Sequence, residues 1–400
     1  MNANLSIERA AADARFIRAG INAAFRERIG KATDVEFNFL GASTGDSEAS
    51  YATDQLVEVR VSSAQHVADF RGVRLAVIAA GTWHWTTAAT EHFADLPQSG
   101  TASTDVDRMV AYASLIVGNM PVLRAQQGEH VAIVAVDFHP YLDFRQTLLR
   151  GLQHSSAEAD EKGPALALAR YLDMESTAEE PYLHFSDGTT VRFEQSSPGV
   201  HKISSITPGL AAARVLEDAF YLSTESQMFF QGNFPDATVE LDVDKATATV
   251  SYSGGQITAN AVLIATISDE EFTWAWADPK LKDTAAARLA GNLARFGIDE
   301  AVPELVRPHI PLSLARGHQL PQLALPILGI WTLAGTTLAD ARVGLVLLDA
   351  PQLHLPEPTP AATEATLSVP PPSWINADRA RAAYGSFRGV EAVSYTHLRA

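Results

Sequence analysis

The chain has 400 residues, of which 46% are hydrophobic, carries a formal net charge of −17, and contains no cysteine. A chain of this length and apolar content is expected to be globular and to form about two or three domains. The missing cysteines exclude disulfides, zinc–thiolate centres and cysteine nucleophiles, and the acidic charge argues against nucleic acids and anionic membrane surfaces as partners.

The first half of the chain is predicted to begin with a helix and to continue into strands. Residues 7–30 have amphipathic spacing and resemble no signal peptide, so we expect a cytoplasmic protein. Short β-branched or alternating runs predict strands, and Asp187-Gly188 predicts a hairpin turn. The predicted elements that follow are strands 32–39, 73–81 and 129–137, a helix over 164–171, and a hairpin over 181–194.

The second half repeats this order of predicted elements. They are a helix over 209–230, strands 236–243, 259–267 and 341–349, and helices over 283–298 and 377–384. Within them, Asp283 is positioned to cap a helix N-terminus and Gly297 to end the helix. The Pro-rich segment 357–373 is predicted to be an extended, exposed connector.

Two tryptophan pairs suggest that the two halves are copies of each other. Thr82–Trp85 reads TWHW and Thr273–Trp276 reads TWAW, and each pair follows a predicted buried strand. Matching landmarks lie roughly two hundred residues apart, which is the size of one domain. They are Val35 and Val239, Trp83 and Trp274, Asp137 and Asp349, and Tyr171 and Tyr384.

We therefore predict an α+β protein made of two tandem copies of one domain, each with an antiparallel sheet packed against helices. Copy one is assigned to residues 1–206 and closes with the hairpin 181–194. Copy two is assigned to residues 207–390 and lacks an equivalent hairpin, so we expect it to be truncated. Residues 391–400 resemble a translated sequencing-adapter tail and are excluded from the fold prediction.

The segment around the second tryptophan pair resembles an uncharacterised bacterial family. Phe272, Trp274, Trp276 and the run Ala277–Pro279 follow the F-x-W-x-W-A-[ND]-P pattern of a domain of unknown function from high-GC bacteria of the actinobacterial type. The similarity extends over most of 207–390. Copy one resembles the pattern more weakly, with Thr86 and Thr87 after its pair. The resemblance implies a fold but no known activity.

The weak candidates for ligand-binding residues are Trp83, Trp85, Trp274, Trp276 and Asp278. Alternate residues of a strand share one face, so each tryptophan pair could line a pocket or pack into a core. We favour the core interpretation. Asp278 could anchor a ligand beside the aromatic wall, although a turn that begins the next segment explains it more simply.

Acidic residues at strand ends offer few further candidates. Asp137 and Asp349 each end a buried strand, and Asp137 with His139 could act as an acid/base pair, although exposed strand ends are the simpler explanation. Asp242 and Asp244 share a strand face that we interpret as solvent-exposed. The sequence has no recognisable motif for a metal, phosphate or nucleotide cofactor, so we expect no metal and no cofactor.

The biochemical function is not evident from these patterns. We expect a non-enzymatic, cytoplasmic binding or interaction protein whose partner is a protein or a small ligand. An immunity-like role, in which an acidic face neutralises a basic toxin, would suit the charge. The alternative is a hydrolase or transferase with its site at the domain junction or beside a Trp-x-Trp strand.

Overall fold

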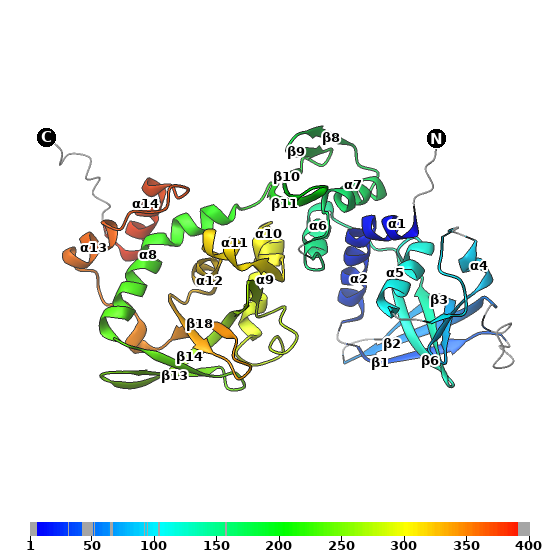
Figure 1. Cartoon of the computed structure of the whole chain (residues 1–400), viewed down its shortest axis with the longest axis horizontal. Coiled ribbons are helices and arrows are strands. Elements are labelled where there is room, and N and C mark those ends of the chain that lie inside the picture. The colour runs from blue at the N-terminus through cyan, green and yellow to red at the C-terminus, as the bar shows by residue number, and fades with distance from the viewer. Residues whose placement is uncertain are drawn as a thin grey trace. The chain divides into compact units, whose positions relative to one another are not determined.

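The computed structural model describes residues 6–390 except 31, 42–50, 52, 65–66, 92, 94, 103–104 and 157 (Figure 1). The predicted tail 391–400 lies outside the described residues. The chain forms two compact units, the first mainly up to Lys202 and the second mainly from Ile203 onward. Helices and antiparallel strands are both abundant, so the predicted α+β class is confirmed. Among the helices described, none is long and apolar enough to cross a membrane.

The first unit begins with two helices in place of the single helix predicted over 7–30. Ser6 caps α1 (Ile7–Asp13), and α2 (Arg15–Ile29) follows directly after Ala14. The other helices of this unit are α4 (Thr87–Thr90), α5 (Val106–Ile116), α6 (Phe144–Leu152) and α7 (Lys162–Tyr171). Phe25 of α2 and Met109 of α5 each join a core of buried side chains on the sheet, because both helices are amphipathic.

The sheet of the first unit has seven strands in the order β1-β2-β3-β4-β5, and β7 pairs with both β3 and β6. The strands are β1 (Ala32–Phe39), β2 (Gln55–Ser63), β3 (Val67–Ala79), β4 (Thr82–Trp85), β5 (Thr101–Ala102), β6 (Val122–Gln127) and β7 (His130–Val136). The pairings place β2 and β4 one after the other along one edge of β3, and β7 along its other edge.

The sheet of the second unit also has seven strands, in the order β12-β13-β14-β15-β16, with β18 pairing with β14 and β17. The strands are β12 (Thr238–Asp242), β13 (Thr247–Tyr252), β14 (Gly255–Ser268), β15 (Glu271–Trp274), β16 (His309–Pro311), β17 (Thr332–Thr337) and β18 (Val343–Asp349). The strands of the two seven-stranded sheets therefore pair with one another in the same order.

A register shift occurs at the same place in both sheets. The pairing of β3 with β7 skips Leu75, and the pairing of β14 with β18 skips Ile264. In each case the skipped carbonyl accepts a backbone hydrogen bond from the residue just after the short strand, Thr86 at 2.9 Å and Ala275 at 2.8 Å. This common bulge provides a register for comparing the two sheets residue by residue.

The helices of the second unit contribute to two hydrophobic clusters that also contain residues of its sheet. The helices are α8 (Ala212–Asn233), α9 (Gly291–Asp299), α10 (Pro303–Val306), α11 (Leu312–Gly317), α12 (Leu320–Leu328), α13 (Pro360–Leu367) and α14 (Ala377–Arg388), with short 3-10 turns at Arg288–Ala290 and Pro351–Leu353. In Figure 1, α13 and α14 lie beside the long helix α8. Tyr384 of α14 donates a hydrogen bond to the buried Glu225 of α8 at 3.1 Å.

The predicted helix 283–298 is wrong over its first half. Residues 283–287 form turns, and α9 begins only at Gly291. The backbone of Ala286 bridges two other segments, since its N–H donates to Val243 and its carbonyl accepts from Leu263. Those groups are therefore not available to a helix, and Asp283 caps none. Gly297 lies inside α9 rather than at its end.

The predicted connector 357–373 is not extended throughout. It contains α13, whose first turn is capped by the hydroxyl of Thr359 and begins with Pro360. Proline at this position needs no amide hydrogen and has a backbone angle suited to a helix. Thr366 is buried on this helix, which packs on α8.

A separate four-stranded sheet has the order β11-β10-β9-β8. Its strands are β8 (Ser176–Glu179), β9 (Tyr182–Phe185), β10 (Thr190–Ser197) and β11 (Val200–Thr207). In the place of the predicted hairpin, β9 and β10 flank a turn in which Gly188 has a positive φ of 87°. Asp187 accepts a hydrogen bond from the amide of Thr189 at 2.8 Å and thus holds the turn.

Candidate functional site

The first tryptophan pair lies in the core of its unit. Trp83 and Trp85 on β4 are 0% and 2% exposed, and their ring centroids are 5.0 Å apart. The indole nitrogen of Trp85 donates to the carbonyl of Pro97 at 2.9 Å. Both rings pack among side chains from α1, α5 and β7. Neither ring has surface left to offer a ligand.

The second aromatic pair is shifted by two residues relative to the prediction. Trp85 lies opposite Ala76 and Trp274 opposite Ala265, in both cases directly after the bulge. The landmark that matched Trp83 with Trp274 is therefore wrong, and Phe272 is the residue that corresponds to Trp83. The rings of Phe272 and Trp274 are 4.8 Å apart, and Trp274 donates to the carbonyl of Glu304 at 2.9 Å.

Trp276 differs from the other three members of the two Trp-x-Trp pairs, Trp83, Trp85 and Trp274. It lies beyond the end of β15 and is half-buried between two hydrophobic clusters of the second unit. Its indole nitrogen has no acceptor among the residues that the structure describes. The strand alternation predicted for Trp274 and Trp276 does not apply, because the chain turns after Trp274.

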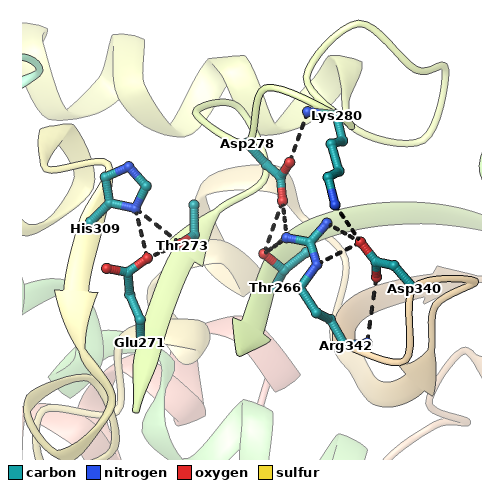
Figure 2. A network of polar contacts seen from close by, with 8 residues as sticks. All are labelled: Thr266, Glu271, Thr273, Asp278, Lys280, His309, Asp340 and Arg342. Atoms are coloured by element: carbon teal, nitrogen blue, oxygen red, sulfur yellow. Dashed lines mark hydrogen bonds and ion pairs between the residues drawn. The ribbon is translucent and has the colours of Figure 1, made fainter. Parts of the chain in front are cut away.

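Asp278 lies at the centre of a polar network at one edge of the second sheet (Figure 2). It is 2% exposed, and its carboxylate forms an ion pair with Arg342, which lies in the loop between β17 and β18. The hydroxyl of Thr266 donates to the same carboxylate oxygen at 3.2 Å. The amide of Lys280 donates to the other oxygen at 2.9 Å. The charge of Asp278 is thus neutralised within the protein.

Arg342 connects Asp278 to the surface. It also donates to Asp340 at 2.9 Å, and Lys280 approaches the same carboxylate at 3.3 Å (Figure 2). The hydrogen bond from Arg342 lowers the pKa of Asp340 to about 2. The pKa of Arg342 is raised, chiefly by Asp340 and secondly by Asp278. The network therefore favours the charged forms of Asp340 and Arg342 and holds the side chain of Asp278 in place.

A second polar group lies on the neighbouring strands β15 and β16 (Figure 2). Glu271 accepts from the hydroxyl of Thr273 at 3.1 Å and lies 3.0 Å from Nδ1 of His309. The Thr273 hydroxyl also lies 3.1 Å from that same nitrogen. A hydroxyl–histidine–carboxylate triad needs the acid and the nucleophile on different ring nitrogens. These three side chains do not have that arrangement.

The corresponding corner of the first unit has different chemistry. In the register of the two sheets, Val77 corresponds to Thr266. His130 corresponds to Arg342, because each directly precedes a matching strand residue, Val131 or Val343. Nε2 of His130 lies 2.9 Å from the hydroxyl of Tyr51, whose ring contacts His84 at 5.1 Å. An aromatic cluster thus replaces the charged network.

Asp137 and His139, the candidate acid/base pair, lie close together, and a similar pair lies at the end of β18. Asp137 lies 3.1 Å from Nε2 of His139, and Asp349 lies 2.8 Å from Nε2 of His354. Both pairs are exposed to solvent at corresponding ends of β7 and β18. Asp242, also exposed, is paired with Lys245 at 2.7 Å. Across the described part of the chain, no group of three or more His, Asp or Glu side chains could hold a metal ion.

Sequence reasoning identified Asp278 but missed its partner. The sequence around Arg342 does not indicate which carboxylate it pairs with, because Arg342 and Asp278 lie on different loops. Phe272 could have been found by comparing aromatic residues in general instead of tryptophans alone. The fourth landmark also differs in its surroundings, because Tyr171 is exposed and Tyr384 is buried.

A comparison with protein families finds one match. Residues 213–351 match a family described as "Family of unknown function (DUF6882)". The matched stretch runs from α8 to the end of β18 and includes the whole Asp278 network. Over this stretch the chain is similar to an uncharacterised domain. No curated protein and no solved structure matches the chain.

Proposed function

We propose that this protein acts by binding a basic protein partner and does not catalyse a reaction. The observation that carries the proposal is the ion pair between Asp278 and Arg342. Asp278, the carboxylate that follows the aromatic motif, is buried and paired with Arg342, so its oxygens are not free to contact a substrate. Thr273 and Glu271 both contact Nδ1 of His309, whereas a catalytic triad needs them on different ring nitrogens. This group therefore does not support the alternative function of a hydrolase or transferase.

The surface charge supports a basic partner. The chain has 47 acidic and 30 basic residues, and the acids beside the aromatic motif account for little of the surplus. A surplus of this size attracts positively charged proteins and accelerates their association. Neutralisation of a basic toxin, an immunity-like role in the cytoplasm of a bacterium, is one form that this function would take.

We further infer that residues 1–206 and 207–390 are diverged copies of one domain. Three features support this inference: the common strand order, the bulge at Leu75 and Ile264, and the indole hydrogen bonds of Trp85 and Trp274. Copy two has kept the charged network and the family motif. Copy one has neither at the corresponding place, so the two copies offer different surfaces.

A peptide-display selection on the immobilised full chain tests the proposed function. We expect sequencing of the bound peptides to show enrichment in Lys and Arg over a random library. Raising the salt from about 50 mM to about 500 mM should remove most of the bound peptides, because it screens exposed charges. Equal recovery of acidic and basic peptides, or recovery that does not change with salt, would contradict the proposal.

A further inference from the structure

The outer edges of the two sheets differ in how they are protected. In the second unit, the sheet curls until β12 approaches β17, and the hydroxyl of Thr336 donates to the carbonyl of Val239 at 2.7 Å. In the first unit, Ala125 occupies the position of Thr336, as its pairing with Ala132 shows. Alanine has no hydroxyl with which to reach the edge of β1.

The outer edge of β1 therefore lacks the contact that Thr336 makes with the edge of β12. Within the described ranges, β1 pairs only with β2. Val35, which corresponds to Val239, is 37% exposed, whereas Val239 is half-buried. An exposed edge strand presents unpaired N–H and C=O groups that can pair with another strand.

The register shows which residues present these groups. The amide of Leu40 donates to Leu56, so Leu40 belongs to a hydrogen-bonded pair with β2. Such pairs alternate along an antiparallel ladder. Asn38 and Glu36 therefore bond to β2, while Val35 and Phe37 direct their N–H and C=O groups to the open edge.

The side chains on the solvent face of this edge are acidic. Asp34 and Glu36 are both exposed on β1. Arg60, which lies opposite Glu36, is already paired with Asp69 on its other side at 2.7 Å. Neither Asp34 nor Glu36 forms an ion pair among the described residues, although the pKa of Arg60, raised chiefly by its hydrogen bond to Asp69, is also raised to a lesser degree by the charge of Glu36. Phe37, on the opposite face of β1, packs against the core and anchors the strand.

We propose that β1 is a docking edge for an extended segment of a partner protein in which Lys or Arg alternates with apolar residues. The added strand would bond to the backbone of Val35 and Phe37, and its basic side chains would face Asp34 and Glu36. Its apolar side chains would lie on the same face of the sheet as Phe37, opposite the acidic residues. This inference rests on the proposed function and assigns a place and a chemistry to the partner.

The same acids argue against a second copy of this chain as the occupant. Antiparallel pairing of two β1 edges would bring Asp34 and Glu36 of one chain opposite those of the other. Like charges directly opposite each other destabilise strand pairs. A basic segment would place opposite charges across from Asp34 and Glu36, which stabilises strand pairing, so charge complementarity favours it as the occupant.

The test uses the full chain and a fluorescent, end-capped peptide that alternates Lys and Val. Fluorescence anisotropy gives its affinity, and hydrogen exchange locates its contact. We expect binding to slow exchange at the amides of Val35 and Phe37 about tenfold. An alternating Glu–Val peptide serves as the charge control and should not bind.

Two variants and one control separate backbone from charge contributions. Val35→Pro removes an outward N–H without removing a bond to β2, and should weaken the binding of the peptide about tenfold or more. Asp34→Asn with Glu36→Gln should weaken it about three- to tenfold and reduce its salt dependence. Val239→Pro makes the corresponding change in β12 and should leave the affinity unchanged. Circular dichroism checks that each variant is folded.

The outcomes distinguish this inference from the proposed function. Wild-type affinity in folded Val35→Pro, slowed exchange only at sites other than β1, or no binding of the Lys–Val peptide would each overturn the docking edge. If basic peptides from the display selection still bind in any of these cases, the proposed function stands with a different site. If they do not bind either, both proposals are wrong.

Discussion

Asp278 and Arg342 form a buried ion pair that joins the turn after β15 to the loop between β17 and β18. The carboxylate is almost fully buried and accepts further hydrogen bonds from Thr266 and Lys280. Breaking a pair of this kind on one side is costly, because the remaining member keeps its charge but loses its main partner inside the protein.

Asp278→Ala is therefore expected to destabilise the second unit by about 3 kcal/mol, near the low end for buried pairs, because Arg342 still reaches water and keeps Asp340 as a partner. Urea unfolding followed by circular dichroism measures the loss. The double variant Asp278→Leu with Arg342→Met should recover most of the stability, since it removes both charges. Asp340→Asn, on the exposed side of Arg342, should cause a much smaller change. Equal losses for Asp278→Ala and the double variant would show that the ion pair is not the cause.

The stability of the same corner should depend on pH in the acid range. The pKa of Asp340 is lowered from 3.8 to about 2 because Arg342 donates to it. A lowered folded-state pKa means that the carboxylate contributes stability above pH 3.8 and loses it as the pH falls toward about 2. The difference in unfolding free energy between wild type and Asp340→Asn should shrink over this window. An NMR titration midpoint near 3.8 in the folded protein would argue against this assignment.

The tryptophans offer a matched pair of substitutions. Trp85 donates its indole hydrogen to Pro97, whereas the indole nitrogen of Trp83 has no acceptor within the described part of the chain. Both rings are buried, so replacement by Phe leaves similar cavities. Trp85→Phe should cost about 1 kcal/mol more than Trp83→Phe, which is the typical net value of one hydrogen bond. Denaturant titration of the two variants measures the difference, and equal losses would mean that the bond to Pro97 contributes nothing.

Two glycines of α9 should respond to alanine in opposite directions. A Cβ at Gly297 would lie 2.8 Å from Cβ of Leu305 and 2.8 Å from Cγ1 of Val306, whereas a Cβ at Gly291 would meet nothing within 4 Å. Gly297→Ala is expected to destabilise the protein by about 1–3 kcal/mol through overpacking. Gly291→Ala should stabilise it by about 0.4–1 kcal/mol by restricting the unfolded chain. Thermal unfolding midpoints that move in the same direction would contradict the close approach of α10 to α9.

Much of the fold is predictable from the sequence because strands leave a local signal. The strands β3, β7, β14 and β18 coincide with β-branched, apolar runs, and α8 coincides with an amphipathic stretch. The segment 283–290 is rich in Ala, a good helix former, yet the backbone of Ala286 is bonded to Leu263 and Val243. Long-range hydrogen bonds of this kind override local propensity and leave no pattern in the sequence.

The candidate site was less predictable than the fold. Asp278 stands out because it follows the aromatic motif, but its charge is cancelled by a residue more than sixty positions later. The correspondence of Phe272 with Trp83 depends on the bulges at Leu75 and Ile264, and no residue type identifies a bulge in advance. Matching the Trp-x-Trp motifs of the two halves pairs Trp83 with Trp274, whereas the register of the two sheets pairs Trp83 with Phe272 and Trp85 with Trp274.

The hydroxyl of Thr336 has a practical consequence for handling the protein. Its hydrogen bond to Val239 covers part of the edge of β12, which leaves less open backbone for strands of neighbouring molecules to pair with. The first unit relies on Asp34 and Glu36 alone, and charge repulsion fades when salt is added. Concentrated solutions should therefore stay clear at low ionic strength and form assemblies through β1 at high ionic strength, the reverse of ordinary salting-in. The residue at position 125 would decide which behaviour is seen.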